Sequence, residues 1–230
     1  MKDFSKFETT LGITFKSIDL LKIALTHRSY LNEHPLWQKE HNERLEFLGD
    51  AVLELVVTEY LYRQFPDKPE GELTSLRAAL VNAQMLGSLA SDLGLNDFIL
   101  LSRGEARDVG RARLAILANT FESVTGAIYL DQGYGAAQAF LERVLFPRLK
   151  DVLDKKLYRD AKSLFQEEAQ ERVSITPTYE VIKEWGPDHD RHFVVGVYLG
   201  HDLIAQGEGP SKQAAQQQAA EAALNIKKWG

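Results

Sequence analysis

HNERLEFLGDAVLELVV, residues 41–57, places three carboxylates on one face of a predicted helix. At about 100° per residue, Glu43, Glu46 and Asp50 fall within one narrow stripe. A separate apolar stripe on the same helix has four members, Leu45, Leu48, Val52 and Leu55. Like charges stacked on a helix lower its stability unless a cation compensates them. The stretch therefore predicts a packed helix with an acidic face.

A second acidic position lies in LANTFESVTGAIYLD, residues 117–131, where Asn119 and Glu122 are three residues apart on an apolar helix. Two such helices side by side would form a site with oxygen ligands only. Oxygen ligands select Mg²⁺ or Mn²⁺ rather than zinc, and such sites suit displacement at phosphorus. The alternative is a solvated acidic helix face, and the spacing alone leaves both interpretations open.

The sequence around these two segments predicts an all-helical domain over residues 1–150. Apolar residues recur at helical spacing from Phe15 to about Leu145, and long strand-like alternation is absent there. Breaks fall at residues 65–69, which include two prolines, and at residues 104–110, which begin and end with glycine. A short charged connector is predicted at residues 151–160.

Residues 161–230 have a different pattern, which predicts a small α+β domain with the order α-β-β-β-α. Its predicted elements are a helix at 162–172, strands at 179–185, 192–199 and 203–206, and a last helix capped by Ser211. One stripe of the last helix is expected to lie close against the sheet, and it consists of Ala215, Ala219, Ala222 and Ile226.

Composition excludes some functions and gives little direct support for nucleic-acid binding. The chain has no cysteine, which rules out disulfides, thiolate catalysis and cysteine-ligated zinc. Its net charge is −6, with 17 basic and 20 acidic side chains in residues 1–150 and 10 and 13 in the remainder. Neither part has the basic excess that phosphate binding usually leaves. No apolar stretch approaches the roughly 20 residues of a membrane span, so we expect a soluble, cytoplasmic protein.

Four motifs in the predicted helical domain resemble the ribonuclease III family. They are ERLEFLGDAVLE at 43–54, ALTHRSY at 24–30, EGEL at 70–73 and ILANTFESVTGAIYLD at 116–131. Residues 162–228 resemble a double-stranded-RNA-binding domain, with KSLFQEEAQ, PTYE, GPDHDRHF and GEGPSKQAAQQQAA in order. The resemblance implies an all-α endonuclease domain followed by a small α+β domain that binds double-stranded RNA.

The resemblance also assigns residues to the predicted metal site. It implies that Glu46, Asp50, Asn119 and Glu122 surround Mg²⁺, for which Mn²⁺ can substitute, and that Asp50 and Glu122 are the catalytic pair. Many relatives carry Asp where this chain has Asn119. An amide oxygen still ligates Mg²⁺ but brings no negative charge, so metal affinity is expected to be lower.

Three further positions carry expected roles by the same resemblance. Glu43 and Glu70 match auxiliary acidic positions near the scissile phosphate. Phe47 matches an aromatic residue at the contact where two catalytic domains pair as a homodimer, and a core role for Phe47 is the alternative. Four arginines, Arg103, Arg107, Arg111 and Arg113, precede the second acidic helix and either hold backbone phosphates or belong to a solvated loop.

The second domain is expected to contact the RNA through three surfaces. Gln166 and Gln170 match positions that offer amides to 2′-hydroxyl groups, and His189 lies in the turn that enters the next minor groove. Lys212 opens the last helix and supplies charge for a phosphate. The alternatives are solvated glutamines and an ordinary hairpin turn. Gln213 replaces a lysine that is usual in the family, so we expect weak binding that assists the nuclease.

Together these observations predict an endoribonuclease that cleaves double-stranded RNA with Mg²⁺. The resemblance implies products with 5′-phosphates, 3′-hydroxyls and short 3′ overhangs, and roles in the processing of ribosomal RNA precursors, mRNA and small RNA. The motifs GxSxG, GK[ST] and GxGxxG are absent, so no nucleotide or organic cofactor is expected. The alternative is a non-catalytic RNA-binding regulator on the same scaffold, which only Asn119 favours.

Overall fold

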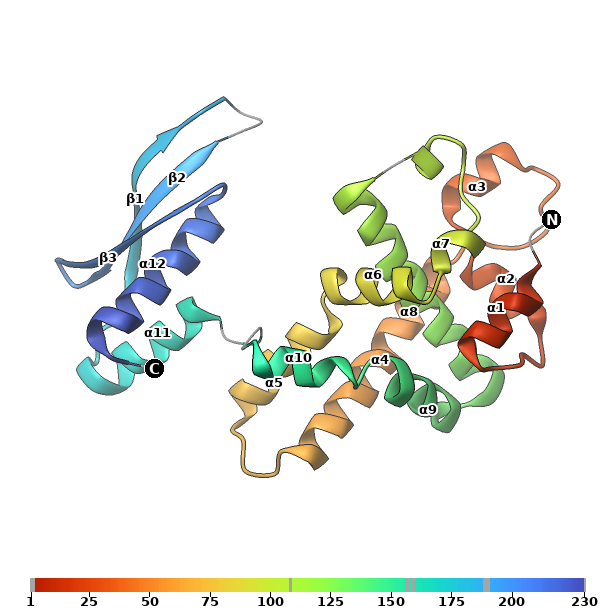
Figure 1. The fold of residues 1–230 in the computed structure, drawn as a ribbon, viewed down its shortest axis with the longest axis horizontal. Helices are drawn as coiled ribbons and strands as arrows, with labels where there is room; N and C mark the ends of the chain where they lie inside the picture. The colour runs from red at the N-terminus through yellow and green to blue at the C-terminus, as the bar shows by residue number, and fades with distance from the viewer. Residues whose placement is uncertain (1–2, 108, 156–157, 159, 188–190, 230) are drawn as a thin grey trace. The chain divides into compact units, whose positions relative to one another are not determined.

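The residues that the computed structural model describes are 3–107, 109–155, 158, 160–187 and 191–229. The chain divides into two compact units, Met1–Tyr158 and Arg159–Gly230. Figure 1 shows a first unit made of helices and a second unit that combines helices with a sheet. The predicted fold class, an all-α domain followed by a small α+β domain, is confirmed. Among the described residues, no helix has both the length and the apolar character needed to cross a membrane.

The first unit consists of helices and the loops between them. The helices are α1 (Phe4–Leu11), α2 (Ile18–Ala24), α3 (Arg28–Glu33), α4 (Glu43–Gln64), α5 (Glu70–Val81), α6 (Ala83–Asp92), α7 (Leu95–Phe98), the 3-10 helix η1 (Glu105–Arg107), α8 (Gly110–Gln132), α9 (Tyr134–Val144) and α10 (Arg148–Asp154). Because α10 continues to Asp154, the first part of the expected connector is helical.

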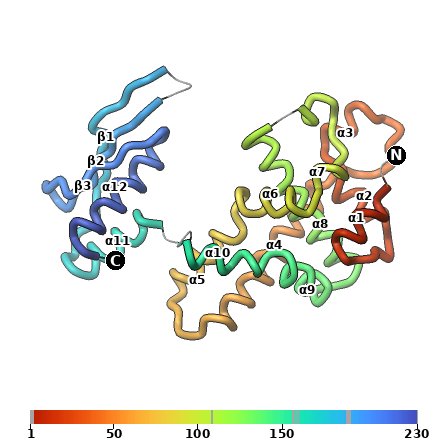
Figure 2. Tube along the Cα trace, in the orientation of Figure 1, coloured from red at the N-terminus to blue at the C-terminus, as the bar shows by residue number. Residues whose placement is uncertain are grey.

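Helices α4 and α8 pack against each other at the centre of this unit (Figure 2). Helix α4 also contacts α5 and α9, and α8 also contacts α2, α6 and α9. A helix enclosed by several neighbours is apolar on several faces, which is what both sequences show. Leu53, Val57, Phe121 and Val124 are fully buried along the two helices. The predicted acidic segments therefore lie on two helices that the hydrophobic core holds in place.

The backbone of the ALTHRSY motif forms hydrogen bonds with two other segments, around Leu100 and around Asn42. Thr26 forms an isolated parallel bridge with Leu100, and the amide of Leu100 donates to the carbonyl of Leu25 at 2.7 Å. The amide of Asn42, the residue before α4, donates to the carbonyl of Thr26 at 2.9 Å. Thr26 is fully buried, so these bonds form in a water-poor environment where they are strong. The start of α4 is thereby fixed to α2 and to the loop before α8.

The second unit has the predicted α-β-β-β-α order. Its elements are α11 (Ala161–Val173), β1 (Thr178–Trp185), β2 (His192–Leu199), β3 (Asp202–Gly209) and α12 (Lys212–Lys227). The strands form an antiparallel sheet in the order β1-β2-β3. Helix α12 packs against β2, β3 and α11. A Cβ atom on Gly207 would lie 2.2 Å from the amide nitrogen of Ala219, so glycine is what lets α12 approach the sheet.

Two predicted apolar stripes are wrong in part. On α12 the residues buried against the sheet are Ala215, Ala219, Ala220 and Ala223, whereas Ile226 is 62% exposed near the end of the helix. On α4, Leu45 and Val52 are buried as expected but Leu55 is 57% exposed. Leu55 lies at the edge of its stripe, where the described part of the first unit leaves it exposed to solvent.

Candidate active site

Two glycines allow the backbones of α4 and α8 to touch. A Cβ atom on Gly49 would lie 1.8 Å from the backbone oxygen of Glu122, and one on Gly126 would lie 2.4 Å from the backbone oxygen of Leu45. No side chain fits at either position without moving a helix. Because Asp50 is adjacent to Gly49, this contact brings the acidic segments of both helices to one place.

The acidic side chains of the two helices influence one another electrostatically. Burial, and then the charges of Asp50 and Glu46, raise the pKa of Glu122 from 4.5 to about 7. Burial and the neighbouring Glu43 raise the pKa of Glu46, and a hydrogen bond from the Asn119 side chain opposes that rise. The structure therefore brings together Glu46, Asp50, Asn119 and Glu122, the four residues that the family resemblance implies for a metal site.

The donor set fits a hard divalent cation by its chemistry. Three carboxylates and one amide offer oxygen ligands only, which Mg²⁺ and Mn²⁺ prefer. Partly buried carboxylates that repel one another are stabilised when a cation neutralises them. Among the described residues, no three carboxylate or imidazole groups lie close enough together to hold a metal ion as they stand. A shared cation at this place would therefore need the carboxylates to move closer together than they lie here.

Glu43 lies beside this cluster and has basic neighbours. Its carboxylate forms an ion pair with Arg28 at 3.4 Å, and the His41 ring lies at 3.8 Å. Sequence reasoning gave no role to Arg28 or His41. Arg28 lies in the quoted ALTHRSY motif, but a motif does not show which side chains the fold brings together. Glu43 therefore links the acidic face of α4 to Arg28, the first residue of α3, through an ion pair.

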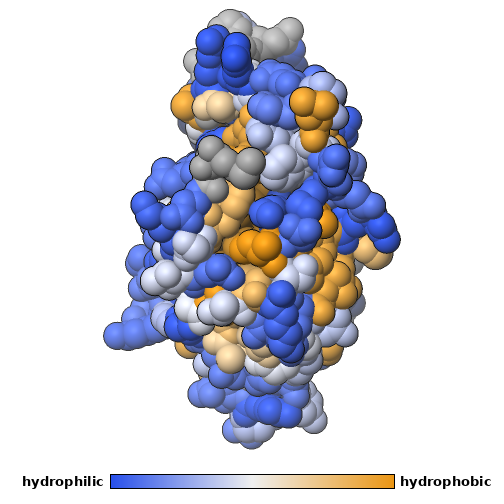
Figure 3. Space-filling model, turned by 90° about the vertical axis from the view of Figure 1, so that its right-hand side faces the viewer, coloured by the Kyte–Doolittle hydropathy of each residue, from blue (hydrophilic) through white to orange (hydrophobic). Residues whose placement is uncertain are grey.

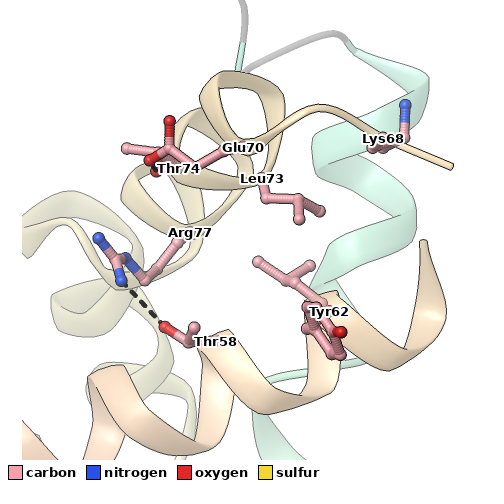
Figure 4. A pocket seen from close by; sticks show the side chains of 8 residues that line it. Thr58, Tyr62, Lys68, Glu70, Leu73, Thr74 and Arg77 are labelled. Carbon is pink, nitrogen blue, oxygen red and sulfur yellow. Dashed lines mark hydrogen bonds between the residues drawn. The ribbon is translucent and has the colours of Figure 1, made fainter. Parts of the chain in front are cut away.

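Glu70 does not join the acidic cluster of its own chain. It lines a pocket between α4 and α5 together with Thr58 and Tyr62, as Figure 4 shows. These two residues follow Asp50 on α4 by eight and twelve positions, which is about 12 and 18 Å at 1.5 Å per residue. The pocket has a volume of about 390 Å³, and Arg77 donates to the Thr58 hydroxyl at 3.0 Å across it.

Phe47 is 83% exposed, so the alternative core role for it is wrong. Two further apolar side chains of α4 are also exposed, Leu55 at 57% and Tyr62 at 71%. On the face drawn in Figure 3, apolar residues in orange reach the surface among hydrophilic ones. A row of large exposed apolar side chains on one helix is typical of a surface that another protein covers.

The four arginines do not act as one group, and two of them, Arg111 and Arg113, lie in the first turn of α8 rather than in the predicted loop. Arg113 is half-buried, and its Nε donates to the side-chain oxygen of Asn96 at 2.8 Å. Arg103, Arg107 and Arg111 are exposed. Only these three side chains are therefore available for a phosphate backbone.

The predicted RNA-binding residues of the second unit lie at the surface. Gln166 and Gln170 are exposed on α11, and Lys212 is exposed at the first position of α12. Ser211 caps α12 as predicted, because its hydroxyl accepts a hydrogen bond from the amide of Ala214 at 3.1 Å. His189 lies outside the described residues.

Without divalent metal, we expect the stability of the first unit to fall as the pH rises from about 4.5 to about 7. Folded Glu122 keeps its proton up to about pH 7, whereas an unfolded glutamate releases it near 4.5. The folded state then binds more protons in this window, so its stability decreases with pH. The rise in the pKa of Glu122 corresponds to a loss of about 3 kcal/mol in the free energy of unfolding across this pH range. Partial exposure of the side chain reduces this loss to roughly 1–2 kcal/mol.

Thermal unfolding in EDTA across this pH range measures the effect. Glu122→Gln should flatten the pH dependence, because the amide does not titrate. Equal slopes in the variant and the parent protein would contradict the assignment of the raised pKa to Glu122.

Both units match known families. Residues 17–149 match the family described as Ribonuclease-III-like, and residues 161–227 match the Double-stranded RNA binding motif. A protein called Ribonuclease 3 from Enterococcus faecalis is 47% identical over 93% of this chain and 92% of its own length. Another from Nitratiruptor is 44% identical over 99% of this chain and 98% of its own length.

A solved structure resembles the first unit in particular. It is the nuclease domain of ribonuclease III from Campylobacter jejuni, which is 42% identical in sequence and superimposes with a TM-score of 0.58. The match covers 63% of this chain and 97% of the Campylobacter chain. That structure is described as showing flexibility in the region involved in dimer formation. The resemblance thus covers the acidic helices and their surroundings.

Proposed function

Because this chain belongs to the ribonuclease III family and is an endoribonuclease specific for double-stranded RNA, we propose that it hydrolyses phosphodiester bonds at the α4–α8 contact with Mg²⁺. The supporting observation is the convergence of the two acidic helices, which raises the pKa of Glu122 to about 7. We propose the metal and its ligands together, because the oxygen ligands suit Mg²⁺ and a bound cation would offset the repulsion between the carboxylates.

Each side chain has a proposed part in the site. Asp50 and Glu122 bind the metal as carboxylates, Glu46 is the third acidic ligand, and Asn119 contributes its amide oxygen. Bound Mg²⁺ lowers the pKa of a water and stabilises charge on the phosphate oxygens. Burial and the charges of Asp50 and Glu46 raise the pKa of Glu122 to about 7, so the negative charge of the site increases as the pH rises through neutrality. Glu43 orients the side chains of Arg28 and His41 at the edge of the site through its contacts with them.

We propose that the protein forms a homodimer, in which the two subunits contact each other through the exposed side of α4. Phe47, Leu55 and Tyr62 lie within about 80° of one another around this helix. In a two-fold contact, each residue meets the other end of the same stripe on the partner. Phe47 of one subunit then faces the pocket beside Tyr62 of the partner subunit, whose walls include the apolar Leu61 and Leu73. Glu70 of the partner subunit lies at the rim of that pocket, near the acidic cluster.

We expect Phe47→Ala to weaken association of the subunits without destabilising the fold. The side chain is 83% exposed within its own chain, so its removal costs little packing there. An aromatic residue buried in an interface contributes roughly 2 kcal/mol or more. The substitution removes this residue from both subunits, so the loss of roughly 4 kcal/mol raises the dissociation constant about 700-fold. Sedimentation equilibrium measures this change.

Leu36→Ala is the control for this prediction. Leu36 is 92% exposed but lies in the loop between α3 and α4, outside the row of α4 residues that forms the proposed contact. Its removal should leave association unchanged. If Phe47→Ala associates as tightly as the parent protein, the proposed interface is wrong.

The second unit is proposed to hold the duplex and to assist the nuclease. Gln166 and Gln170 present amides to one minor groove, and Lys212 with the first turn of α12 binds a phosphate. The resemblance to double-stranded-RNA-binding domains leads us to expect basic residues at the positions of Gln213 and Pro210, which carry no charge. Each missing phosphate contact lowers the salt dependence of binding by about one unit of slope.

Two sites on opposite strands of a duplex account for the proposed products. We expect 5′-phosphates, 3′-hydroxyls and 3′ overhangs of about two nucleotides. Ribosomal RNA precursors, mRNA and small RNA are the proposed substrates, and cytoplasmic action follows from where those RNAs are processed. A non-catalytic regulator is the less favoured alternative, since the chain retains three carboxylates at the site.

The test is a labelled RNA duplex of several tens of base pairs, incubated with the protein and Mg²⁺, Mn²⁺ or EDTA. A single-stranded RNA runs beside it. Metal-dependent cuts on both strands, offset by about two nucleotides, are the expected result. Binding without cutting at any metal concentration would favour the regulator and make Asn119→Asp the next variant.

A further inference from the structure

Ser123 is a buried hydroxyl between the two acidic helices. It follows Glu122 on α8 and is fully buried. Its Oγ donates to the backbone oxygen of Asn119 on its own helix at 2.8 Å and to the backbone oxygen of Asn42 at 3.3 Å. A hydroxyl has one proton, so the two acceptors share it. Ser123 is thus hydrogen-bonded both to α8 and to the residue that precedes α4.

The acceptor on the other side is itself held in place. Asn42 is 2% exposed and is the N-cap residue of α4. Its backbone oxygen also accepts from the amide of Glu46 at 2.9 Å, and its own amide donates to Thr26 at 2.9 Å. The carbonyl that Ser123 contacts is therefore part of the first turn of α4, which carries Glu43 and Glu46.

Other buried hydroxyls on α8 lack such a connection. Thr120 donates to the backbone oxygen of Ile116 at 2.7 Å, and Thr125 donates to that of Phe121 at 3.0 Å. Both are fully buried, and both of these hydrogen bonds stay within the helix. Within the described part of α8, these residues are matched controls for a hydroxyl that bridges two helices.

The Ser123 bridge is a second point of contact beside the glycine contact. Gly49 and Gly126 fix how closely the helices approach, and the buried side chains packed between the helices limit their rotation and sliding. The bond from Ser123 to Asn42 lies about one turn from the contact of Gly126 with Leu45 on each helix. The hydrogen bond adds a directional constraint at the start of α4 to this packing.

We propose that Ser123 is a positioning residue that keeps Asn119 and Glu122 in register with Glu46 and Asp50 for metal binding. The inference rests on the proposed metal site. Without the hydroxyl, this directional constraint is lost, and the four ligands converge less well on one ion.

The experiment is a titration of the full-length protein with Mn²⁺, followed by electron paramagnetic resonance, in the absence of RNA. Ser123→Ala is expected to raise the Mn²⁺ dissociation constant about fivefold, which is roughly 1 kcal/mol at 1.4 kcal/mol per tenfold. Thr125→Val removes a hydroxyl from the same helix and should stay within about twofold of the parent protein. Ser123→Thr retains a hydroxyl and should restore most of the affinity.

The outcomes separate this inference from the proposed function. If the parent protein binds no Mn²⁺, the proposed metal site itself fails. If the parent binds and Ser123→Ala binds equally well, even with a lower melting temperature, Ser123 has only a structural role and the inference is overturned. Should Ser123→Ala not fold, Ser123→Thr is compared with Ser123→Val, which differ by the hydroxyl alone. Equal affinity in that pair would also overturn it.

Discussion

Glu122→Gln is expected to cut duplex RNA at least about a thousandfold more slowly than the parent protein while binding the duplex within about twofold. The amide keeps the size of the side chain but removes the charge of a proposed metal ligand. Changes in groups that only support a metal ligand cost 10- to 100-fold, so loss of a ligand should cost more. The proposed RNA contacts lie elsewhere, largely on the second unit, so binding should persist.

Single-turnover cleavage at several Mg²⁺ concentrations and a filter-binding assay in Ca²⁺ or EDTA measure the two properties. Glu142→Gln is the control, because it makes the same chemical change at an exposed position on α9. It should cleave as the parent protein does. A fully active Glu122→Gln protein would remove Glu122 from the proposed metal site.

Gly49→Ala should lower the free energy of unfolding by about 3 kcal/mol or more and slow cleavage about a hundredfold. The added Cβ atom would lie 1.8 Å from the backbone oxygen of Glu122. Overpacking costs 1–3 kcal/mol where side chains yield, and here a helix backbone must move instead. A displacement of about 1 Å at a catalytic group costs about a hundredfold in rate.

Urea unfolding of the two variants Gly49→Ala and Gly135→Ala tests the stability part. Gly135 lies in α9, and a Cβ atom there would meet nothing within 4 Å. The control should be as stable as the parent protein or more stable, by up to about 1 kcal/mol, because alanine favours a helix. If Gly49→Ala matches the parent protein, the backbone contact does not hold the helices as described.

The acidic positions were predictable because they depend on local spacing. Glu46 and Asp50 share one helix, as do Asn119 and Glu122, so periodicity alone places each pair on a face. The fold class was predictable for the same reason. The change from helical to alternating patterns near residue 160 coincides with the start of α11 and the sheet that follows.

Relations between segments were not predictable from spacing. Gly49 reads as an unfavourable residue inside a helix, and only the crossing with α8 shows why it is needed. Glu70 was expected near the scissile phosphate, yet it lines a pocket about 12 Å or more along α4 from Asp50. Ser123 has no sequence signal, because its acceptor is a backbone atom that any residue would supply.

The exposed α4 residues show a further limit. Leu55 fits an apolar periodicity, but periodicity cannot tell a core face from a face that is covered only by another molecule. The same holds for Ile226 on α12, which follows the alanine stripe but is exposed near the end of the helix.

Helix α8 carries half of the site on one of the most enclosed segments of the first unit. From Leu117 to Ile128 nearly every residue is buried, and the helix contacts α2, α4, α6, α7 and α9. Segments of this kind open only when the whole domain unfolds, whereas sites on loops open by local fluctuation. The half of the site on α8 is therefore as resistant to local opening as the core of the first unit itself.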